Sequence, residues 1–134
     1  MHPFRAAVES RDVEAMRDLL ADDVVFNSPI AHTTYRGRDV VGGVLAAVVQ
    51  VFEDFVYEGE LTGEDPADHG LVFRARVGEK ALQGIDLVRT GDDGRITELT
   101  VMIRPLSAAI AVRDAMGAML AKAGVDPKAL SGGG

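Results

Sequence analysis

The sequence predicts an α+β domain in which helices precede an antiparallel sheet and one more helix follows it. Residues 3–20 place apolar side chains near helical spacing. Residues 56–105 alternate apolar with polar side chains between turns rich in Gly and Asp, which is typical of antiparallel strands. Residues 106–123 are again helical in composition, rich in Ala and Met. This order favours helices gathered on one face of a curved sheet.

The first helical segment begins beside Pro3, a residue common at helix starts. The sequence Ser-Arg-Asp at residues 10–12 interrupts the apolar pattern, so two helical pieces are expected. The run DVVFNSP at residues 23–29 is apolar and stops at a proline, which predicts a short strand.

A further helix is expected over residues 37–55, after a loop over residues 30–37. Asp39 is placed to cap its first turn. Gly42 and Gly43 would allow another element to approach closely.

The second half of the chain predicts a meander of strands over residues 56–63, 71–77, 81–90 and 95–105. Turns at residues 64–70, 78–80 and 91–94 separate them. In the second strand, Arg74 and Arg76 lie on the face opposite Phe73, because successive side chains alternate between faces. The final helix is expected to bury one stripe formed by Leu106, Ile110, Met116 and Leu120.

Length and composition exclude several function classes. The 134 residues predict one domain over 1–130 and a flexible Ser-Gly tail over 131–134. The net charge of −7 argues against a nucleic acid partner, which would need a basic surface. Absence of cysteine excludes disulfides and thiolate chemistry and favours the cytoplasm. No apolar run is long enough to cross a membrane.

The residues DVEAMRDLLADDVVFNSP, then YRGRDVVGGVL, then a strand with a central Asp resemble the nuclear transport factor 2-like superfamily. This superfamily includes SnoaL-like polyketide cyclases and ketosteroid isomerases. The resemblance covers about residues 3–105 and implies a cystatin-like cone, in which a strongly bent antiparallel sheet wraps around the N-terminal helices. It also implies an apolar pocket inside the cone and a homodimer packed through the outer sheet face. The helix expected after residue 105 lies outside this resemblance and is additional to the cone.

The isomerase pattern transfers only in part. Its general base falls on Ser28 and its aromatic hydroxyl on Phe4, so neither group is present. Its third functional group, a carboxylic acid kept neutral in an apolar site, falls on Asp86. The resemblance therefore implies the place of a pocket more strongly than the isomerase reaction.

Asp86 stands in the middle of the strand QGIDLVRT. Alternation puts Ile85 and Leu87 on one face and Gly84, Asp86 and Val88 on the other, which lines the pocket of a cone. Burial there would disfavour the charged carboxylate, so a raised pKa of Asp86 is expected. The alternative is an ordinary Asp that bonds a buried arginine or a backbone amide.

The expected pocket is lipophilic, with few polar groups. Its candidate lining residues are Phe4, Phe26, Ser28, His32, Tyr35, Phe73, Asp86, Leu99, Val101 and Ile103. His32 and Tyr35 are placed at its mouth. Ser28, His32 and Asp86 supply the residue types of a nucleophilic triad, but a triad is recognised by geometry, and a loop histidine is expected to be exposed. No cofactor is expected, and His2, His32 and His69 lack the spacing of metal ligands.

Charged side chains expected on the outer sheet face are Glu60, Arg74, Arg76, Glu98 and Arg104. Thr100 and Met102 share that face. Such a mixed surface is either solvated or the contact of an isologous homodimer, which the resemblance favours. The final helix either packs on the sheet or covers the pocket as a lid, where Met116 and Met119 would adapt to varied ligands.

Three functions follow from these observations. The first is binding of an apolar small molecule whose hydroxyl or carbonyl meets Asp86. The second is an isomerase, cyclase or epoxide hydrolase that acts on a steroid, terpenoid or polyketide-like substrate, with Asp86 as acid or base. The third is a protein-interaction module with a vestigial pocket. A cavity filled by its own side chains would favour the third.

Overall fold

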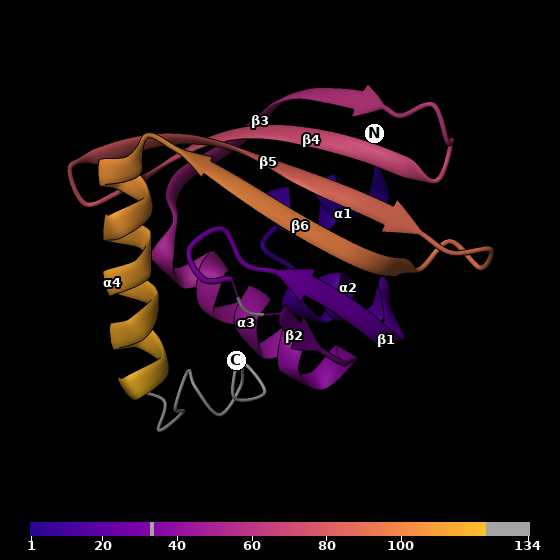
Figure 1. Cartoon of the computed structure of the whole chain (residues 1–134), viewed down its shortest axis with the longest axis horizontal. Coiled ribbons are helices and arrows are strands. Elements are labelled where there is room, and N and C mark those ends of the chain that lie inside the picture. Colours follow the sequence, from indigo (N-terminus) through magenta and orange to yellow (C-terminus); the bar gives the residue numbers. More distant parts are fainter. Residues whose placement is uncertain (33, 123–134) are drawn as a thin grey trace.

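The computed structural model describes residues 1–32 and 34–122, which form helices and one sheet of order β2-β1-β6-β5-β4-β3 (Figure 1). The helices are α1 (Pro3–Glu9), α2 (Val13–Asp18), α3 (Arg38–Val51) and α4 (Leu106–Lys122). The strands are β1 (Leu20–Asn27), β2 (Thr34–Arg36), β3 (Glu53–Thr62), β4 (Asp68–Val77), β5 (Lys80–Thr90) and β6 (Ile96–Arg104). The α+β architecture expected from the sequence is confirmed.

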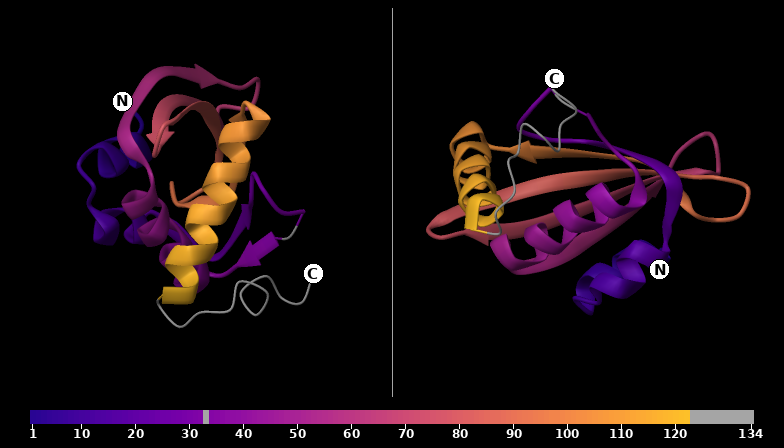
Figure 2. Two further views of the ribbon diagram at one scale, coloured as in Figure 1. Left: turned by 90° about the vertical axis from the view of Figure 1, so that its left-hand side faces the viewer. Right: turned by 90° about the horizontal axis from the view of Figure 1, so that it is seen from below.

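The sheet is bent around the helices. Strands β3 to β6 form the expected antiparallel meander, whereas β1 joins β6 in parallel. Register shifts occur between β1 and β6, twice between β3 and β4, and between β5 and β6. Each such irregularity bends the strand and increases its twist. Figure 2 shows the strands curving around an interior, with α4 crossing one end of the curve.

The break between the first two helices lies where the sequence predicts it. His2 caps α1, and its Nδ1 accepts a 3.1 Å hydrogen bond from the amide of Phe4. Arg11 has a φ of 56°, which takes the chain out of the helix. Asp12 then caps α2 by accepting a 3.0 Å bond from the amide of Ala15.

Several predicted boundaries around β1 and β2 are wrong. The strand predicted at 23–29 begins at Leu20, because its ladder with β6 already starts at the Leu20–Ile96 pair. Ser28 therefore follows the strand. The predicted loop at 30–37 contains β2, whose Tyr35 pairs with Phe26.

The predicted boundaries of α3 and β3 also change. The helix ends at Val51 and not at residue 55, and β3 begins at Glu53. Gly37 is the N-cap, whereas Asp39 lies in the first turn and forms an ion pair with Arg17. The turn predicted at 64–70 is shorter, because β4 begins at Asp68.

The stripe predicted for helix α4 is confirmed at Met116 and Leu120 and wrong at its other two positions. Ala108, Val112, Met116 and Leu120 are buried. Leu106 and Ile110 are instead exposed, at 76% and 40%. The predicted last residue of this helix, 123, and the predicted tail at 131–134 lie outside the described residues.

The outer sheet face carries paired charges and apolar side chains. Arg74 bonds Glu58 at 2.6 Å, and Arg76 bonds Glu53 at 2.6 Å. Glu60 was expected on this face, but the register shift after Tyr57 turns it toward α1. There it accepts a 3.2 Å bond from Arg5 of α1.

The hydrophobic core is built from the side chains of the inner sheet face and of the helices that face it. Phe73 of β4 is fully buried, and its ring lies over Gly84 of β5. A Cβ at Gly84 would lie 2.3 Å from Phe73 Cζ and 2.7 Å from the Met102 carbonyl oxygen. Glycine is thus required for this packing. Among the described residues, no helix combines the length and apolar character needed to cross a membrane.

Candidate functional site

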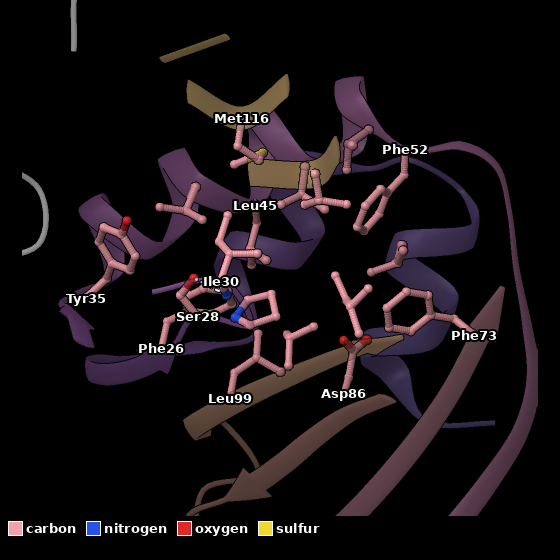
Figure 3. Close-up of a pocket in the computed structure, with 18 of the residues that line it drawn as sticks. Phe26, Ser28, Ile30, Tyr35, Leu45, Phe52, Phe73, Asp86, Leu99 and Met116 are labelled. Carbon is pink, nitrogen blue, oxygen red and sulfur yellow. Dashed lines mark hydrogen bonds between the residues drawn. The ribbon is translucent and has the colours of Figure 1, made fainter. Parts of the chain in front are cut away.

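A cavity of about 340 Å³ lies between the inner sheet face and helices α1, α3 and α4 (Figure 3). This volume falls in the range of small-molecule sites, roughly 300–1,000 Å³. Its walls are predominantly aliphatic and aromatic side chains, among them Val44, Leu45, Val48, Phe52 and Phe55. The interior of the fold is therefore hollow and apolar.

Most predicted site residues lie at this cavity. Those that line it are Phe4, Phe26, Ser28, Tyr35, Phe73, Asp86, Leu99, Val101 and Ile103. His32 is exposed and is not among the described residues that line the cavity. The loop after β1 leaves His32 exposed, as expected of a loop histidine, and its contribution to ligand binding stays a prediction. Whether the nine others bind a ligand stays a prediction.

Asp86 is the polar group at the buried end of the cavity. It is 7% exposed and pairs across the sheet with Leu71 and Val101, so its neighbours on the strands are apolar. The hydroxyl of Tyr57 donates a 2.6 Å hydrogen bond to Asp86 Oδ2. Among the described residues this hydroxyl, and not an arginine or a backbone amide, is its hydrogen-bond partner.

Burial raises the pKa of Asp86 to about 7, although the hydrogen bond from Tyr57 acts in the opposite direction. Burial and then the negative charge of Asp86 raise the pKa of Tyr57 as well. Tyr57 therefore stays a protonated donor at neutral pH. Asp86 is present there both as the acid and as the carboxylate, which is the range useful for acid-base chemistry.

Sequence reasoning missed Tyr57. It lies on β3 and is 3% exposed. The ring of Phe55 meets it edge-on, with centroids 4.8 Å apart, and the ring of Phe73 does so at 6.2 Å. From the other side, the guanidinium of Arg5 lies 5.9 Å from its ring centroid. The aromatic pattern Phe-Val-Tyr was an available signal, since it puts two rings on one strand face.

Ser28 serves the backbone of its own loop. Its Oγ accepts hydrogen bonds from the amides of Ile30 at 3.2 Å and Ala31 at 3.3 Å. Within residues 1–32 and 34–122, no hydrogen bond joins Ser28, His32 and Asp86. The structure therefore does not assemble the nucleophilic triad.

No cluster of potential metal ligands was found in the described part of the chain. The fold nevertheless brings two of the three histidines together. The rings of His2 and His69 meet edge-on with centroids 4.8 Å apart, and desolvation followed by repulsion from His69 lowers the pKa of His2. This pair stands beside α1 and is not part of the cavity lining.

Helix α4 forms one wall of the cavity. The buried side chains of Val112, Met116 and Leu120 line it, together with Arg113 and Gly117. Met119 packs against the core without lining the cavity. Figure 3 shows Met116 on one side of the cavity and Asp86 on the other. Movement of this helix as a lid stays a prediction.

Comparison with known proteins agrees with this geometry. The model of the SnoaL-like domain matches residues 2–99. A steroid delta-isomerase from Pseudomonas aeruginosa is 43% identical, with a TM-score of 0.87 over 90% of this chain and 88% of that one. A protein with a cystatin-like fold from Silicibacter pomeroyi is 38% identical, with a TM-score of 0.84 over 90% and 87% of the two chains.

A Mycobacterium tuberculosis protein solved in complex with estradiol-17β-hemisuccinate is 20% identical, with a TM-score of 0.63 over 79% of this chain and 91% of that chain. At this identity the likeness shows the fold alone. A search of curated proteins finds no match. The family model spans most of the chain, and the structures with TM-scores of 0.87 and 0.84 agree with the observed fold. The chain belongs to the SnoaL-like domain family of the nuclear transport factor 2-like superfamily.

Proposed function

We propose that the protein binds an apolar small molecule and holds one oxygen of that molecule at the Tyr57–Asp86 pair. The observation that carries this proposal is a buried, hydrogen-bonded acid in a predominantly apolar cavity. A ligand that fills the cavity gains free energy by burying apolar surface. A single polar pair then fixes which end of the ligand enters.

The protonated form of Asp86 suits a carbonyl ligand. In that form the carboxyl group accepts the Tyr57 hydrogen bond at Oδ2 and offers its own proton to the ligand. Donation to a carbonyl also satisfies a buried polar group that would otherwise cost free energy. Ketones with a fused-ring or other rigid apolar body are the class that fits best. The 43% identity to a steroid delta-isomerase supports this class.

An isomerase-type reaction is the second candidate, favoured by 43% identity to a steroid delta-isomerase. A pKa of about 7 suits Asp86 to donate or accept a proton near neutral pH. The resemblance to the isomerases places their general base at Ser28, whose hydroxyl accepts hydrogen bonds from two amides. Asp86 would therefore have to move the proton without that partner. A cyclase or an epoxide hydrolase would likewise need Asp86 to transfer the proton without a second acid-base group at Ser28.

One set of measurements separates these functions. Isothermal titration with 4-androstene-3,17-dione tests binding, and the ultraviolet absorbance of a conjugated enone tests isomerisation of the β,γ-unsaturated ketone. Both are repeated with Asp86→Asn. Turnover that disappears while affinity is retained establishes an enzyme, and binding without turnover establishes a binding protein. If no apolar ketone or hydroxyl compound binds, the proposal is wrong and the interaction module regains support.

The protein is also proposed to form a homodimer through the outer sheet face. Exposed apolar side chains on that face support this: Val56 at 49%, Leu61 at 60%, Leu87 at 40% and Met102 at 55%. They alternate with paired charges, as at many dimer contacts. A location in the cytoplasm, expected from the cysteine-free composition, stays a prediction.

A further inference from the structure

In the described part of the chain, one acidic and one basic residue line the cavity. These are Asp86 and Arg113. They differ in exposure. Asp86 is buried on the inner face of the sheet, whereas the side chain of Arg113 on α4 is 60% exposed. Since Arg113 both lines the cavity and meets solvent, it stands at the mouth. The cavity therefore has one polar end inside and one cationic group at its entrance.

The rest of the mouth is uncharged. Apart from Arg113, the lining residues that are partly buried or exposed are all uncharged, among them Ser28, Pro29, Ile30, Ala31, Tyr35 and Gly117. In Figure 3, Ser28 and Tyr35 lie on the side of the cavity away from Asp86. Among the described lining residues, Asp86 is the only carboxylate. An anion at the mouth would thus meet the guanidinium of Arg113, and the carboxylate beside that group, Asp114, does not line the cavity.

The guanidinium of Arg113 is weakly engaged. Its Nε lies 3.2 Å from Asp114 Oδ1, and both side chains are more than half exposed. Adjacent residues of a helix do not face each other, and exposed ion pairs of this kind contribute little. Within the described residues no hydrogen bond from Nη1 or Nη2 is found. These two donors match the two oxygens of a carboxylate.

We infer that the ligand is an amphiphile whose uncharged oxygen enters toward Tyr57 and Asp86 and whose carboxylate, or a similar anionic group, stays at the mouth against Arg113. This inference rests on the proposed function. The cavity, at about 340 Å³, is near the lower limit of small-molecule sites, so part of a larger ligand projects from it. The projecting part is where Arg113 acts, which makes Arg113 a specificity-determining residue.

Matched probes test this inference. Testosterone hemisuccinate and its methyl ester share the same apolar body and the same ketone, and they differ in the charge of the tail. Titration near pH 6 keeps most of Asp86 protonated, because its pKa is about 7. The wild-type protein is expected to bind the acid roughly 5- to 20-fold more tightly than the ester, the range between exposed and well-engaged charged contacts.

Arg113→Gln should abolish the preference, so that the acid and the ester bind this variant with equal affinity. Arg113→Lys keeps the charge and should keep part of the preference. The control is Arg95→Gln, which removes the same charge from an exposed turn outside the cavity lining. This variant should keep the full preference for the acid over the ester. Because the preference is electrostatic, it should also weaken as salt rises.

The outcomes separate the inference from the proposed function. If the ester binds but the acid has no advantage, or if Arg113→Gln keeps the advantage, the inference is wrong and the apolar binding function stands. If neither probe nor any uncharged steroid ketone binds the wild-type protein, the proposed function is wrong and the inference falls with it. Both glutamine variants should unfold at the same temperature as the wild-type protein, which would confirm that the comparison measures binding and not a loss of structure.

Discussion

The hydroxyl of Tyr57 on β3 donates to the carboxyl group of Asp86 on β5, although β4 lies between these strands. The two residues meet because Tyr57 pairs with Phe73, whose ring lies over Gly84. The small residue on β5 leaves room for the aromatic side chains above the sheet. We therefore expect this hydrogen bond between β3 and β5 to depend on Gly84.

Replacement of Tyr57 by Phe should raise the pKa of Asp86 above about 7, because the hydrogen bond that favours the carboxylate is lost while burial remains. The carboxyl group also loses its partner, which should lower the free energy of unfolding by roughly 1–3 kcal/mol. Titration of the Asp86 carboxyl carbon by NMR measures the first effect, and urea unfolding measures the second.

Tyr35→Phe is the matched control, since it removes the cavity's other phenol hydroxyl while leaving the bond between Tyr57 and Asp86. Its Asp86 should titrate as in the wild-type protein. An Asp86 pKa that is unchanged or lowered in Tyr57→Phe would contradict the role assigned to this bond.

The pH dependence of stability should carry the signature of Asp86. Its pKa is about 7 in the folded protein and 3.8 for the ordinary group, so the folded state binds the proton more tightly. The stabilisation is complete below about pH 4 and is lost as the pH rises through 7. At about 1.4 kcal/mol per pKa unit, its upper bound is on the order of 4 kcal/mol. Urea unfolding of wild type and Asp86→Asn should show a difference that declines over this window.

Asp68→Asn provides a control of opposite sign. The hydrogen bond from Arg89 lowers the pKa of Asp68, so its contribution is present above the ordinary value of 3.8 and is lost as the pH falls. A wild-type advantage over Asp86→Asn that stays constant from pH 4 to 8 would mean that the Asp86 carboxyl group is not desolvated as its burial indicates.

The sequence was sufficient to place Asp86 on the inner sheet face and insufficient to identify Tyr57 as its hydrogen-bond partner. Strand β5 keeps regular alternation from Lys80 to Thr90, so the inward face of Asp86 follows from a period of two. Strand β3 has two register shifts, and alternation cannot be followed across them. The same shifts explain why Glu60 was placed on the wrong face.

Helix α4 gives a second example of this limit. The predicted stripe included Leu106 and Ile110 because they are large and apolar, yet Ala108 and Val112 are the buried residues. Hydrophobic spacing alone could not choose between these faces, because both are apolar over the first turns. Contact with the end of the sheet decides the orientation, and it places Arg113 at the cavity.

Gly84→Ala should destabilise the protein. The added Cβ would lie 2.7 Å from the Met102 carbonyl oxygen and 2.3 Å from the ring of Phe73, so backbone and ring must both shift. Overpacking of this kind costs roughly 1–3 kcal/mol. Urea unfolding measures the loss, and the NMR titration of Asp86 should change with it because Phe73 packs beside Tyr57.

The control for this substitution is Gly43→Ala on α3. No atom lies within 4 Å of its added Cβ, and alanine favours a helix over glycine by about 1 kcal/mol. Gly43→Ala should therefore stabilise the protein, whereas Gly84→Ala destabilises it. Equal effects at the two sites would mean that the close approach over Gly84 does not constrain the sheet.

Met102→Glu should dissociate the proposed homodimer. Met102 is 55% exposed on β6 and lies opposite Ile85 on the outer face, so a dimer contact there would bury a new unpaired charge. Leu106→Glu is the control, since Leu106 is 76% exposed but belongs to α4. Sedimentation velocity should give twice the chain mass of 14.2 kDa for wild type and Leu106→Glu, and the single mass for Met102→Glu. A wild-type protein of single mass would refute the dimer, and a Met102→Glu variant of double mass would move the contact away from β6.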